Sequence, residues 1–479
     1  MKKIFYSILF TILYLVITPS CKRILKPEPE QLLLNDSAIR TVKDLESVLN
    51  GAYDGLQGGN VLAGNMTGYA DLMAEDLDAY DFRLSPFGTL DIYNGQTTVQ
   101  IGALRGMWAD CYSTISRANY VIDAVDNNSV VQSDPTFTAN KDRIKGQALF
   151  IRGIVHFELM KFWSLPYNIQ NPSENSKPQS GVVLRLEPYK IFDPESAKAL
   201  RSTIEECYNQ IIKDLNEANT LLQANTISSP DRISADAAKA VLARVYFNKG
   251  DYTNASSLSN QVISSNRYSL ADSLQLFYKL SGTASIQDIN GGTKPEPIFQ
   301  LVNTANDNSN GLIGYYASNA GALMFIKDDS YNLYTSSDRR RRLISSLFKT
   351  STKYLNPAAV GGLTISPNIC VIRFAEVHLI RAEANLLSGG STQEALDSYN
   401  LIRRRAFKAN YVEETSIEGL LDKVRSERRL EMMCEQSDRY MNLRRLRLPL
   451  RKVNENEYSK FLFKIPQEEV SANPDLLQN

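Results

Sequence analysis

The stretch Val371–Ala406, VIRFAEVHLIRAEANLLSGGSTQEALDSYNLIRRRA, decides the fold of this chain. It is reinforced by Val424–Leu446, VRSERRLEMMCEQSDRYMNLRRL. Both stretches have helical patterns in which Arg and Glu lie among apolar positions instead of forming a separate polar face. A charge inside a packed helix is costly unless it is paired. We therefore expect long helices that are held together by internal ion pairs.

Paired helical patterns of this kind recur along the chain. The clearest pair, Ala235–Ile263, matches the tetratricopeptide pattern of large residues, close-approach alanines and a glycine-containing turn. This match is carried by Leu242, Ala243, Tyr246, Gly250, Tyr252 and Ala255. The pair Glu376–Ala406 repeats the pattern with Ala382 and Ala395. A helical hairpin cannot bury its apolar face alone, so such units stack into a small solenoid, although ordinary bundle packing would give a similar spacing.

Long segments rich in Gly, Ser, Asn and Tyr separate the helical patterns. They are Gly58–Thr98, Gln170–Pro194 and Asn266–Ala359. Segments of this length are too long to be simple connectors in a compact domain, so we interpret them as functional surface or binding structure. Short strands are predicted at Gly181–Leu186 and Pro297–Val302. The expected architecture is a helical scaffold that carries an irregular, loop-rich second layer.

Five motifs, spread over most of the chain, resemble those of the SusD/RagB family of nutrient-binding lipoproteins from Bacteroidetes outer membranes. The family's E-x-x-L-x-x-A-E-A run appears as Glu376, Leu379, Ala382, Glu383 and Ala384. Its N-x-I-R-x-R-A run appears as Asn400, Ile402, Arg403, Arg405 and Ala406. Its E-R-R-x-E…R-Y…L-x-R run appears as Glu427, Arg428, Arg429, Glu431, Arg439, Tyr440, Leu443 and Arg445. The helix Ile144–Pro166 and the closing segment Leu462–Asn479 also match, with Gly153 and Ser164 as departures in the former.

The resemblance implies a mainly α, SusD-like fold, in which a scaffold of tetratricopeptide-like hairpins carries a loop-rich ligand-binding layer. Residues 35–479 would form this one domain. The loop layer would lie chiefly in residues 58–98, 170–194 and 266–359.

The N-terminus reads as an export signal. Lys2 and Lys3 precede an apolar run that is too short to span a bilayer, and a small residue precedes Cys21. We expect a lipoprotein signal peptide over residues 1–20, lipid on Cys21 and an extended tether over residues 21–34. Plain secretion with an incidental cysteine is the alternative. Basic residues directly follow Cys21, so exposure at the cell surface rests on the family resemblance alone.

The overall composition argues against a nucleic-acid partner. Lys plus Arg and Asp plus Glu both number 53, which leaves no net charge. The run Arg339–Arg342 is interpreted as an ion-paired or solvated helix start, with a phosphate-binding patch as the alternative. The other four cysteines lack metal spacing and are expected to be small buried residues, although an exported protein permits a disulfide. They are Cys111, Cys207, Cys370 and Cys434.

Catalytic chemistry has little support in the sequence. The two histidines, His156 and His378, lie within apolar helical patterns, and no hydrolase, metalloprotease or nucleotide-binding motif occurs. We expect no enzyme, no catalytic residue, no metal site and no cofactor. Carboxylates adjacent in sequence, such as Glu75 and Asp76, say nothing about the separation that a glycosidase needs.

Binding is the better interpretation, and two segments supply candidate residues. Gly68–Gly95 combines aromatic and acidic side chains after the element Ala74-Glu75-Asp76, and in the family a segment of this type contributes to the ligand pocket. Asn303–Asp338 adds tyrosines on a glycine-flanked loop. The candidate contacts are Asp78, Tyr80, Arg83, Tyr93, Asn94, Tyr315, Tyr316 and Tyr331. Each of them could instead be a packing or surface residue.

The ligand class stays open between an oligosaccharide and an oligopeptide. Only Trp108 and Trp163 are present, and both lie in helices that the family uses structurally, so a tryptophan platform for sugars is not expected. The resemblance implies a lid on a SusC-like TonB-dependent transporter of the outer membrane, which captures the ligand and delivers it without breaking bonds. The alternative function is a lipid-anchored scaffold for partner proteins with no ligand of its own.

Overall fold

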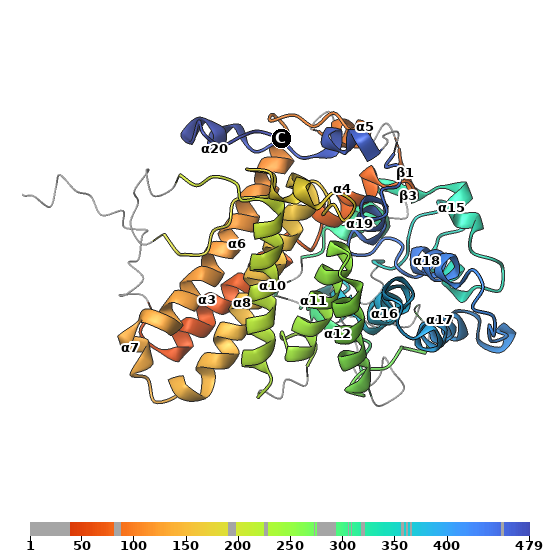
Figure 1. Cartoon of the computed structure of the whole chain (residues 1–479), viewed down its shortest axis with the longest axis horizontal. Helices are drawn as coiled ribbons and strands as arrows, with labels where there is room; N and C mark the ends of the chain where they lie inside the picture. The colour runs from red at the N-terminus through yellow and green to blue at the C-terminus, as the bar shows by residue number, and fades with distance from the viewer. Residues whose placement is uncertain are drawn as a thin grey trace, which may run out of the picture.

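The computed structural model describes residues 39–479, apart from 81–87, 190–197, 225–228, 273, 275–293, 305, 308, 318–320, 356–358, 361–362, 365 and 452–454. The expected signal peptide, tether and Cys21, together with Arg83, lie outside the described residues. Helices dominate the structure (Figure 1), and the predicted mainly α fold is confirmed. No described helix is both long enough and apolar enough to cross a membrane.

A curved row of helices forms the scaffold, and each helix packs against the next along the chain, from α3 to α17 (Figure 1). These helices are α3 (Val42–Gln57), α6 (Gly102–Asn127), α8 (Phe137–Trp163), α10 (Ile204–Leu222), α11 (Ala235–Lys249), α12 (Tyr252–Ser264), α16 (Phe374–Ser388) and α17 (Thr392–Phe407). α18 (Leu420–Glu431) packs against α16 and α17, whereas α19 (Asp438–Arg445) packs against α4 and α11. The helical pattern predicted over Val424–Leu446 is therefore divided between two helices.

The two predicted hairpins are confirmed as α11–α12 and α16–α17. Ser234 caps the start of α11, and Gly250 makes the turn to α12 with φ of +84°, a left-handed conformation that glycine adopts without strain. Ala243 and Ala255 are fully buried and pack with Ala384 of α16. The small side chains let the helices approach closely, which is why the hairpins stack into a continuous row.

The second layer lies mainly along the upper and right-hand edges of Figure 1. Its elements and the remaining short ones are α4 (Asn65–Met73), β1 (Leu77–Ala79), α5 (Thr89–Asn94), α7 (Ser129–Gln132), η2 (Pro172–Ser176), β2 (Pro297–Leu301), η3 (Ile313–Ala317), β3 (Met324–Ile326), α15 (Asp328–Asn332), η4 (Arg339–Leu343), β4 (Ala359–Val360), β5 (Leu363–Thr364), β6 (Ile369–Arg373), η5 (Lys408–Asn410), η6 (Glu455–Phe461) and α20 (Gln467–Ala472). The antiparallel pairs are β1–β3, β2–β6 and β4–β5. The strand predicted at Pro297–Val302 is confirmed as β2.

The strand predicted at Gly181–Leu186 is absent, because its backbone follows an irregular path along α6 and α10. Gly181 N–H donates to Ser202 O, and Tyr112 and Asn119 of α6 donate to backbone carbonyls of Val183 and Arg185. These side-chain bonds satisfy backbone groups that a sheet would otherwise pair.

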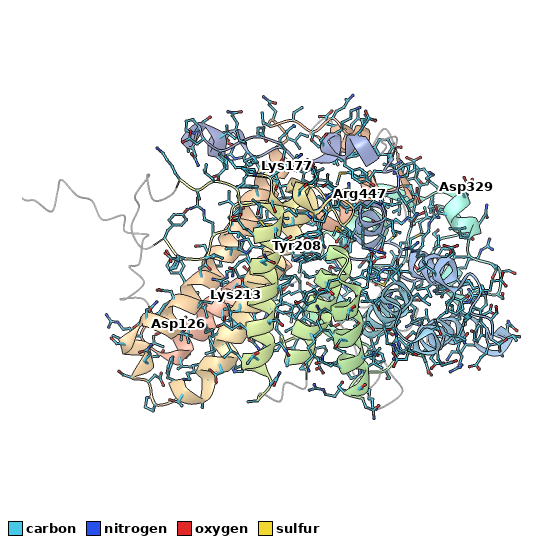
Figure 2. All side chains as sticks on the ribbon, viewed as in Figure 1. Asp126, Lys177, Tyr208, Lys213, Asp329 and Arg447 are labelled. Atoms are coloured by element: carbon cyan, nitrogen blue, oxygen red, sulfur yellow. The ribbon has the colours of Figure 1, made fainter. Side chains whose placement is uncertain are left out.

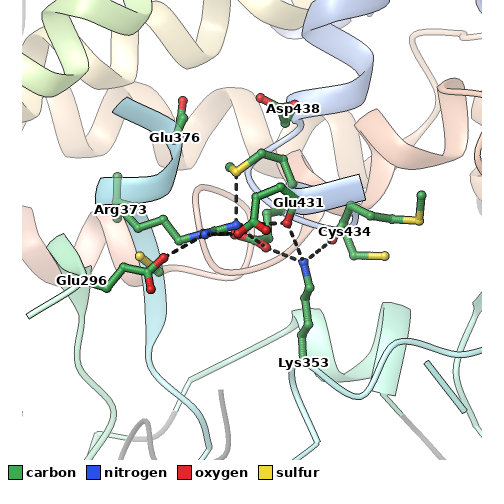
Figure 3. Close-up of polar contacts among 12 residues, drawn as sticks. Glu296, Lys353, Arg373, Glu376, Glu431, Cys434 and Asp438 are labelled. Carbon is green, nitrogen blue, oxygen red and sulfur yellow. Dashed lines mark hydrogen bonds and ion pairs between the residues drawn. The ribbon is translucent and has the colours of Figure 1, made fainter. Parts of the chain in front are cut away.

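A buried ion-pair cluster joins the scaffold to the strands (Figure 3). Arg373, at the end of β6, donates from Nη1 to Glu296 at 2.9 Å and to Glu431 at 2.6 Å. Arg405 of α17 bonds the same two carboxylates, and Arg340 donates to Glu431 Oε2 at 3.1 Å. Burial alone would raise the pKa of Glu431, but the three arginines hold it well below its ordinary value. The expected internal ion pairs are confirmed.

A second set of buried pairs ties α18 and α19 to α16. Glu383 accepts from Arg425 and Arg445, each at 2.8 Å. Glu376 accepts from Arg244 of α11 at 2.7 Å. Arg403, by contrast, remains half-exposed beside Glu427. The run Arg339–Arg342 behaves as an ion-paired helix start, as predicted, because Asp338 accepts from the backbone N–H of Arg340 and pairs with its guanidinium.

The predicted buried positions are found for both histidines and for Cys111, Cys207 and Cys434, whereas Cys370 is only half-buried. His156 and His378 are buried in α8 and α16, and burial lowers the pKa of each to about 3. Among the described residues all four cysteines are free.

The tyrosines of the Asn303–Asp338 segment do not form an exposed surface. Tyr316 is fully buried, donates to Asp71 Oδ2 at 2.6 Å and stacks on Tyr354. Tyr315 is buried against Tyr69 and donates to Asn65 Oδ1 at 2.7 Å. Both tyrosines, predicted as ligand contacts, are packing residues in this structure and are not exposed to a ligand. The physical reason is α4, a helix buried on all sides within the predicted loop Gly58–Thr98, whose polar groups the tyrosines satisfy.

We expect Glu383→Ala to lower the free energy of unfolding by about 3–5 kcal/mol, because it leaves the buried Arg445 guanidinium without its carboxylate. Urea unfolding followed by circular dichroism measures this loss. Arg404→Ala, which removes an exposed pair with Glu413, is the control and should cost less than about 1 kcal/mol. A loss of only a few tenths for Glu383→Ala would contradict the stabilising role of the pair.

Asp71 makes stability depend on pH. Burial raises its pKa to about 7, against the opposing hydrogen bond from Tyr316, whereas its ordinary value is 3.8. Between these values the folded chain keeps a proton that the unfolded chain has released, so the free energy of unfolding falls as pH rises from about 4 to 7.

We therefore expect Asp71→Asn to gain melting temperature relative to the native protein over that interval and to level off above it. Thermal melts at pH 4, 5.5, 7 and 8 measure the difference. Asp142→Asn, on the exposed side of α8, is the control and should give a constant difference. A constant difference for Asp71→Asn as well would refute the raised pKa.

Candidate ligand-binding cleft

A two-stranded ribbon in the loop layer forms one wall of an open cleft. β1 and β3 pair antiparallel with Asp78 opposite Phe325, and Tyr80 N–H extends the ribbon by donating to Leu323 O at 3.3 Å. Side chains alternate between the two faces of a strand. Leu77 and Ala79 are buried against the core, so the outer face carries Asp78, Tyr80 and Phe325.

The facing wall is the turn formed by residues 344–351. Ile344 and Ser351 form a bridge at its base, and Lys349 O accepts from Ile326 N–H of β3 at 2.8 Å. Two large apolar side chains stand at its tip: Leu347 is 77% exposed and Phe348 40% exposed. Water contact with such side chains is unfavourable, so the tip is a candidate contact surface.

The cleft between these walls has a volume of about 470 Å³. The side chains that line it are Tyr80, Phe325, Lys327, Asp328, Asp329, Leu347, Phe348 and Lys349. The rings of Tyr80 and Phe325 lie 4.7 Å apart between centroids, and Lys349 forms an ion pair with Asp328. Asp329 lies at the outer edge of the molecule on α15 (Figure 2). The cleft thus combines aromatic faces with donors and acceptors of both charges.

The scaffold holds this ribbon in place through the acidic pair that precedes β1. Asp76 is buried and accepts from Ser330 Oγ and from Arg429 Nε, both at 2.8 Å. Glu75 forms an ion pair with Arg439 of α19. The Ala74-Glu75-Asp76 element therefore anchors the cleft, and sequence reasoning had used it only as a marker of the pocket segment.

The predicted contacts are distributed unevenly around the cleft. Tyr80 lines it, and Asp78 lies on the same face of the ribbon. Tyr93 donates from its hydroxyl to Asp78, and Arg451 packs over the Tyr93 ring at 4.2 Å. Burial lowers the pKa of Arg451, whereas Tyr93 and Asp78 raise it. Asp78 and Tyr93 are thus already engaged with each other beside the cleft.

Two further predicted contacts lie at the margin. Asn94 is exposed at the end of α5. Tyr331 is on α15, with the Arg341 guanidinium 4.4 Å and Lys349 Nζ 5.9 Å from its ring centroid. Tyr331 therefore contacts the basic side chains beside the cleft but is not among the residues that line it.

Sequence reasoning missed most of the lining residues. Four of them, Phe325, Lys327, Asp328 and Asp329, lie in the run MFIKDD at residues 324–329, within the Asn303–Asp338 segment. A short apolar strand that is followed directly by charged residues is the pattern that could have indicated this wall of the cleft. Leu347 and Phe348 are a second indication of a contact surface, because they are two adjacent apolar residues among polar ones after the basic run Arg339–Arg342.

Comparison with known proteins identifies the family and the fold of the chain. A family model described as "Starch-binding associating with outer membrane" matches residues 32–247, and the SusD family model matches residues 328–461. SusD-like protein P2 of Formosa agariphila is 26% identical over all of this chain and 96% of its own length.

Solved structures show the same fold. A putative sugar-binding protein from Bacteroides vulgatus superposes with a TM-score of 0.76 and 26% identity, covering 92% of this chain and 99% of its own. A SusD superfamily protein from Bacteroides thetaiotaomicron gives a TM-score of 0.74 and 27% identity with the same coverage. The two family models, the full-length relative and these structures lead to one conclusion: the chain belongs to the SusD/RagB family.

Proposed function

We propose that this protein is a lipid-anchored glycan-binding protein of the outer membrane, which captures an oligosaccharide in the cleft and delivers it to a SusC-like TonB-dependent transporter. The observation that carries the proposal is the exposed apolar tip of the 344–351 turn, which faces the Tyr80–Phe325 pair across the cleft. Aromatic faces favour the C–H faces of sugar rings, and a ligand held between the walls would remove the tip from water.

The charged groups of the cleft suit hydroxyl-bearing ligands. Asp328 keeps a carboxylate that is 71% exposed although it pairs with Lys349. Exposed ion pairs contribute little to stability, so exchanging this pair for hydrogen bonds to sugar hydroxyls costs little. Lys327 and Asp329 provide a further donor and acceptor at the same edge.

The relatives favour a glycan over a peptide. The structural neighbour from Bacteroides vulgatus is described as a putative sugar-binding protein, and the model that matches residues 32–247 is described as starch-binding. We keep an oligopeptide as a ligand class to be tested against the glycan. Capture and delivery require no bond breaking: a ligand that binds the closed lid more tightly shifts the lid toward closure.

The domain organisation follows from the same proposal. Residues 1–20 would be removed as a signal peptide, Cys21 would carry the lipid, and residues 21–34 would tether the domain 35–479 to the membrane. Its helical row would dock on the transporter, and the loop layer would face the channel. A scaffold for partner proteins would share the anchor but would need no cleft.

We expect the double variant Tyr80→Ala, Phe348→Ala to weaken binding of the cognate oligosaccharide at least about 10-fold, or about 1.4 kcal/mol, because it removes one aromatic ring from each wall. Isothermal titration calorimetry against panels of oligosaccharides and oligopeptides measures this effect. Leu165→Ala, which truncates an equally exposed apolar residue elsewhere, is the control. Unchanged glycan affinity in the double variant would exclude the cleft, and binding of peptides alone would exclude the glycan.

Anchoring and partnership are tested in the native membrane. We expect Cys21→Ala to move the protein out of the outer-membrane fraction, because a lipid-bearing cysteine is the only anchor that the sequence suggests. Immunoblots of membrane and soluble fractions measure the shift, with Cys111→Ala as the control. Affinity purification of the unaltered protein should recover a TonB-dependent transporter. Recovery of other proteins without a transporter would favour the scaffold function.

A further inference from the structure

A second cavity lies on the scaffold, apart from the cleft. It is enclosed by α6, by residues 183–189 and by the chain around α20, and its volume is about 440 Å³. In Figure 1 α6 and α20 lie to the left, whereas the β1–β3 ribbon lies to the right. We call this cavity the α6 pocket. Its volume falls within the range of about 300–1,000 Å³ that is typical of small-molecule sites.

The floor of the α6 pocket is a fixed aromatic pair. Trp108 and Tyr112 stand one turn apart on α6, with ring centroids 4.7 Å apart and planes inclined by 48°. Trp163 packs edge-on against Trp108 at 5.4 Å, and the Tyr112 hydroxyl donates to Val183 O at 2.9 Å. These contacts hold the two rings in place before any ligand arrives, which reduces the entropy cost of binding.

Trp108 lines the cavity with its ring. Its side chain is almost fully buried, at 3% exposed. Tyr189 adds a third ring at the mouth of the pocket; it is 38% exposed and carries the Arg185 guanidinium 5.1 Å from its ring centroid. Three aromatic side chains around one cavity favour a ligand that offers flat C–H faces, such as a sugar ring.

The polar side of the pocket is balanced in charge. Arg185 and Lys198 face the pocket with Glu187 and Glu469, so the lining contributes two positive and two negative groups. Ser116 adds a hydroxyl on α6, one turn after Tyr112. A lining without net charge does not select an ion, whereas four charged groups around aromatic faces are poorly suited to a purely apolar ligand.

We propose that the α6 pocket binds a neutral sugar unit, one or two pyranose rings, with a ring face on Trp108 and Tyr112 and hydroxyls bonded by the charged rim. The site lies outside the cleft and does not depend on it. A long oligosaccharide that occupies both the cleft and the α6 pocket would dissociate more slowly than one that occupies a single site. When it is released from one site, it remains bound at the other. The sequence indicates only a structural role for Trp108, and the proposal adds contact with a ligand.

The two tryptophans provide a reporter for this site. Trp163 is fully buried and the cleft lining contains no tryptophan, so an emission change on ligand binding would come from Trp108. The full-length protein is titrated with glucose, galactose, maltose and cellobiose, and tryptophan emission and calorimetric heat are recorded together. We expect at least one of these sugars to change the emission.

Matched variants on one helix locate the response. Ser116→Leu places a bulky side chain inside the pocket and should weaken the emission response at least 10-fold. Ser113→Leu places the same side chain on the exposed part of α6 and should leave the response as in the native protein. Tyr189→Ala, at the exposed mouth, should also weaken the response, and it covers the case in which Ser116→Leu misfolds. Circular dichroism melts establish the fold of each variant.

Several outcomes would overturn the proposal. Sugar binding by calorimetry with no emission change, or with a change that survives Ser116→Leu and Tyr189→Ala, would exclude the pocket while leaving the cleft function intact. Loss of the emission change in Tyr80→Ala would assign it to the cleft. An emission change with 1-octanol but with none of the sugars would show an apolar site. If Tyr80→Ala instead reduces the calorimetric binding but keeps the emission response, the two sites are separate and the proposal is supported.

Discussion

Glu431 is a fully buried carboxylate that accepts hydrogen bonds from arginines of β6, α17 and η4. Removing any one partner would leave charge in the interior without compensation, and this is far more costly than losing an exposed pair. The three arginines come from parts of the chain that are far apart in sequence, and Glu296 and Glu435 bind Arg373 as well. The cluster therefore forms only when the helical row, the β2–β6 pair and the short helix η4 come together.

Both walls of the candidate cleft are connected to this cluster through a few residues. Arg340 of the cluster lies in the short helix η4 (Arg339–Leu343), and the cleft wall at residues 344–351 follows this helix directly. On the other side, Asp76 binds Arg429, which lies two residues before Glu431 on α18. Both walls of the cleft are thus fixed to the same helix, so their separation is set by a rigid element and not by loop length. The α6 pocket is built differently, because helix side chains bind the irregular 183–189 backbone directly.

The helices could be predicted because their signals are local. Arg and Glu embedded among apolar residues predicted buried pairs, and the alanine and glycine positions predicted the α11–α12 and α16–α17 hairpins. Which charges pair could not be read in this way, since Arg340 and Glu431 meet only in the folded chain. The same limit explains Tyr315 and Tyr316: their segment looks like an exposed loop until α4, distant in sequence, buries it. Trp108 was assigned to a helix correctly, but the pocket beside it arises from chain that follows much later.

The contact between α12 and α16 has a consequence for how such proteins diversify. These two helices pack directly although more than a hundred residues separate their ends, and the β3 wall and the 344–351 turn both lie in that interval (Figure 1). Mutations, insertions or recombination within the interval can reshape the cleft wall while leaving the helix contact in place. The cleft wall can therefore change its shape without change to the helical scaffold, provided that Arg340 and Arg373 keep their carboxylate partners.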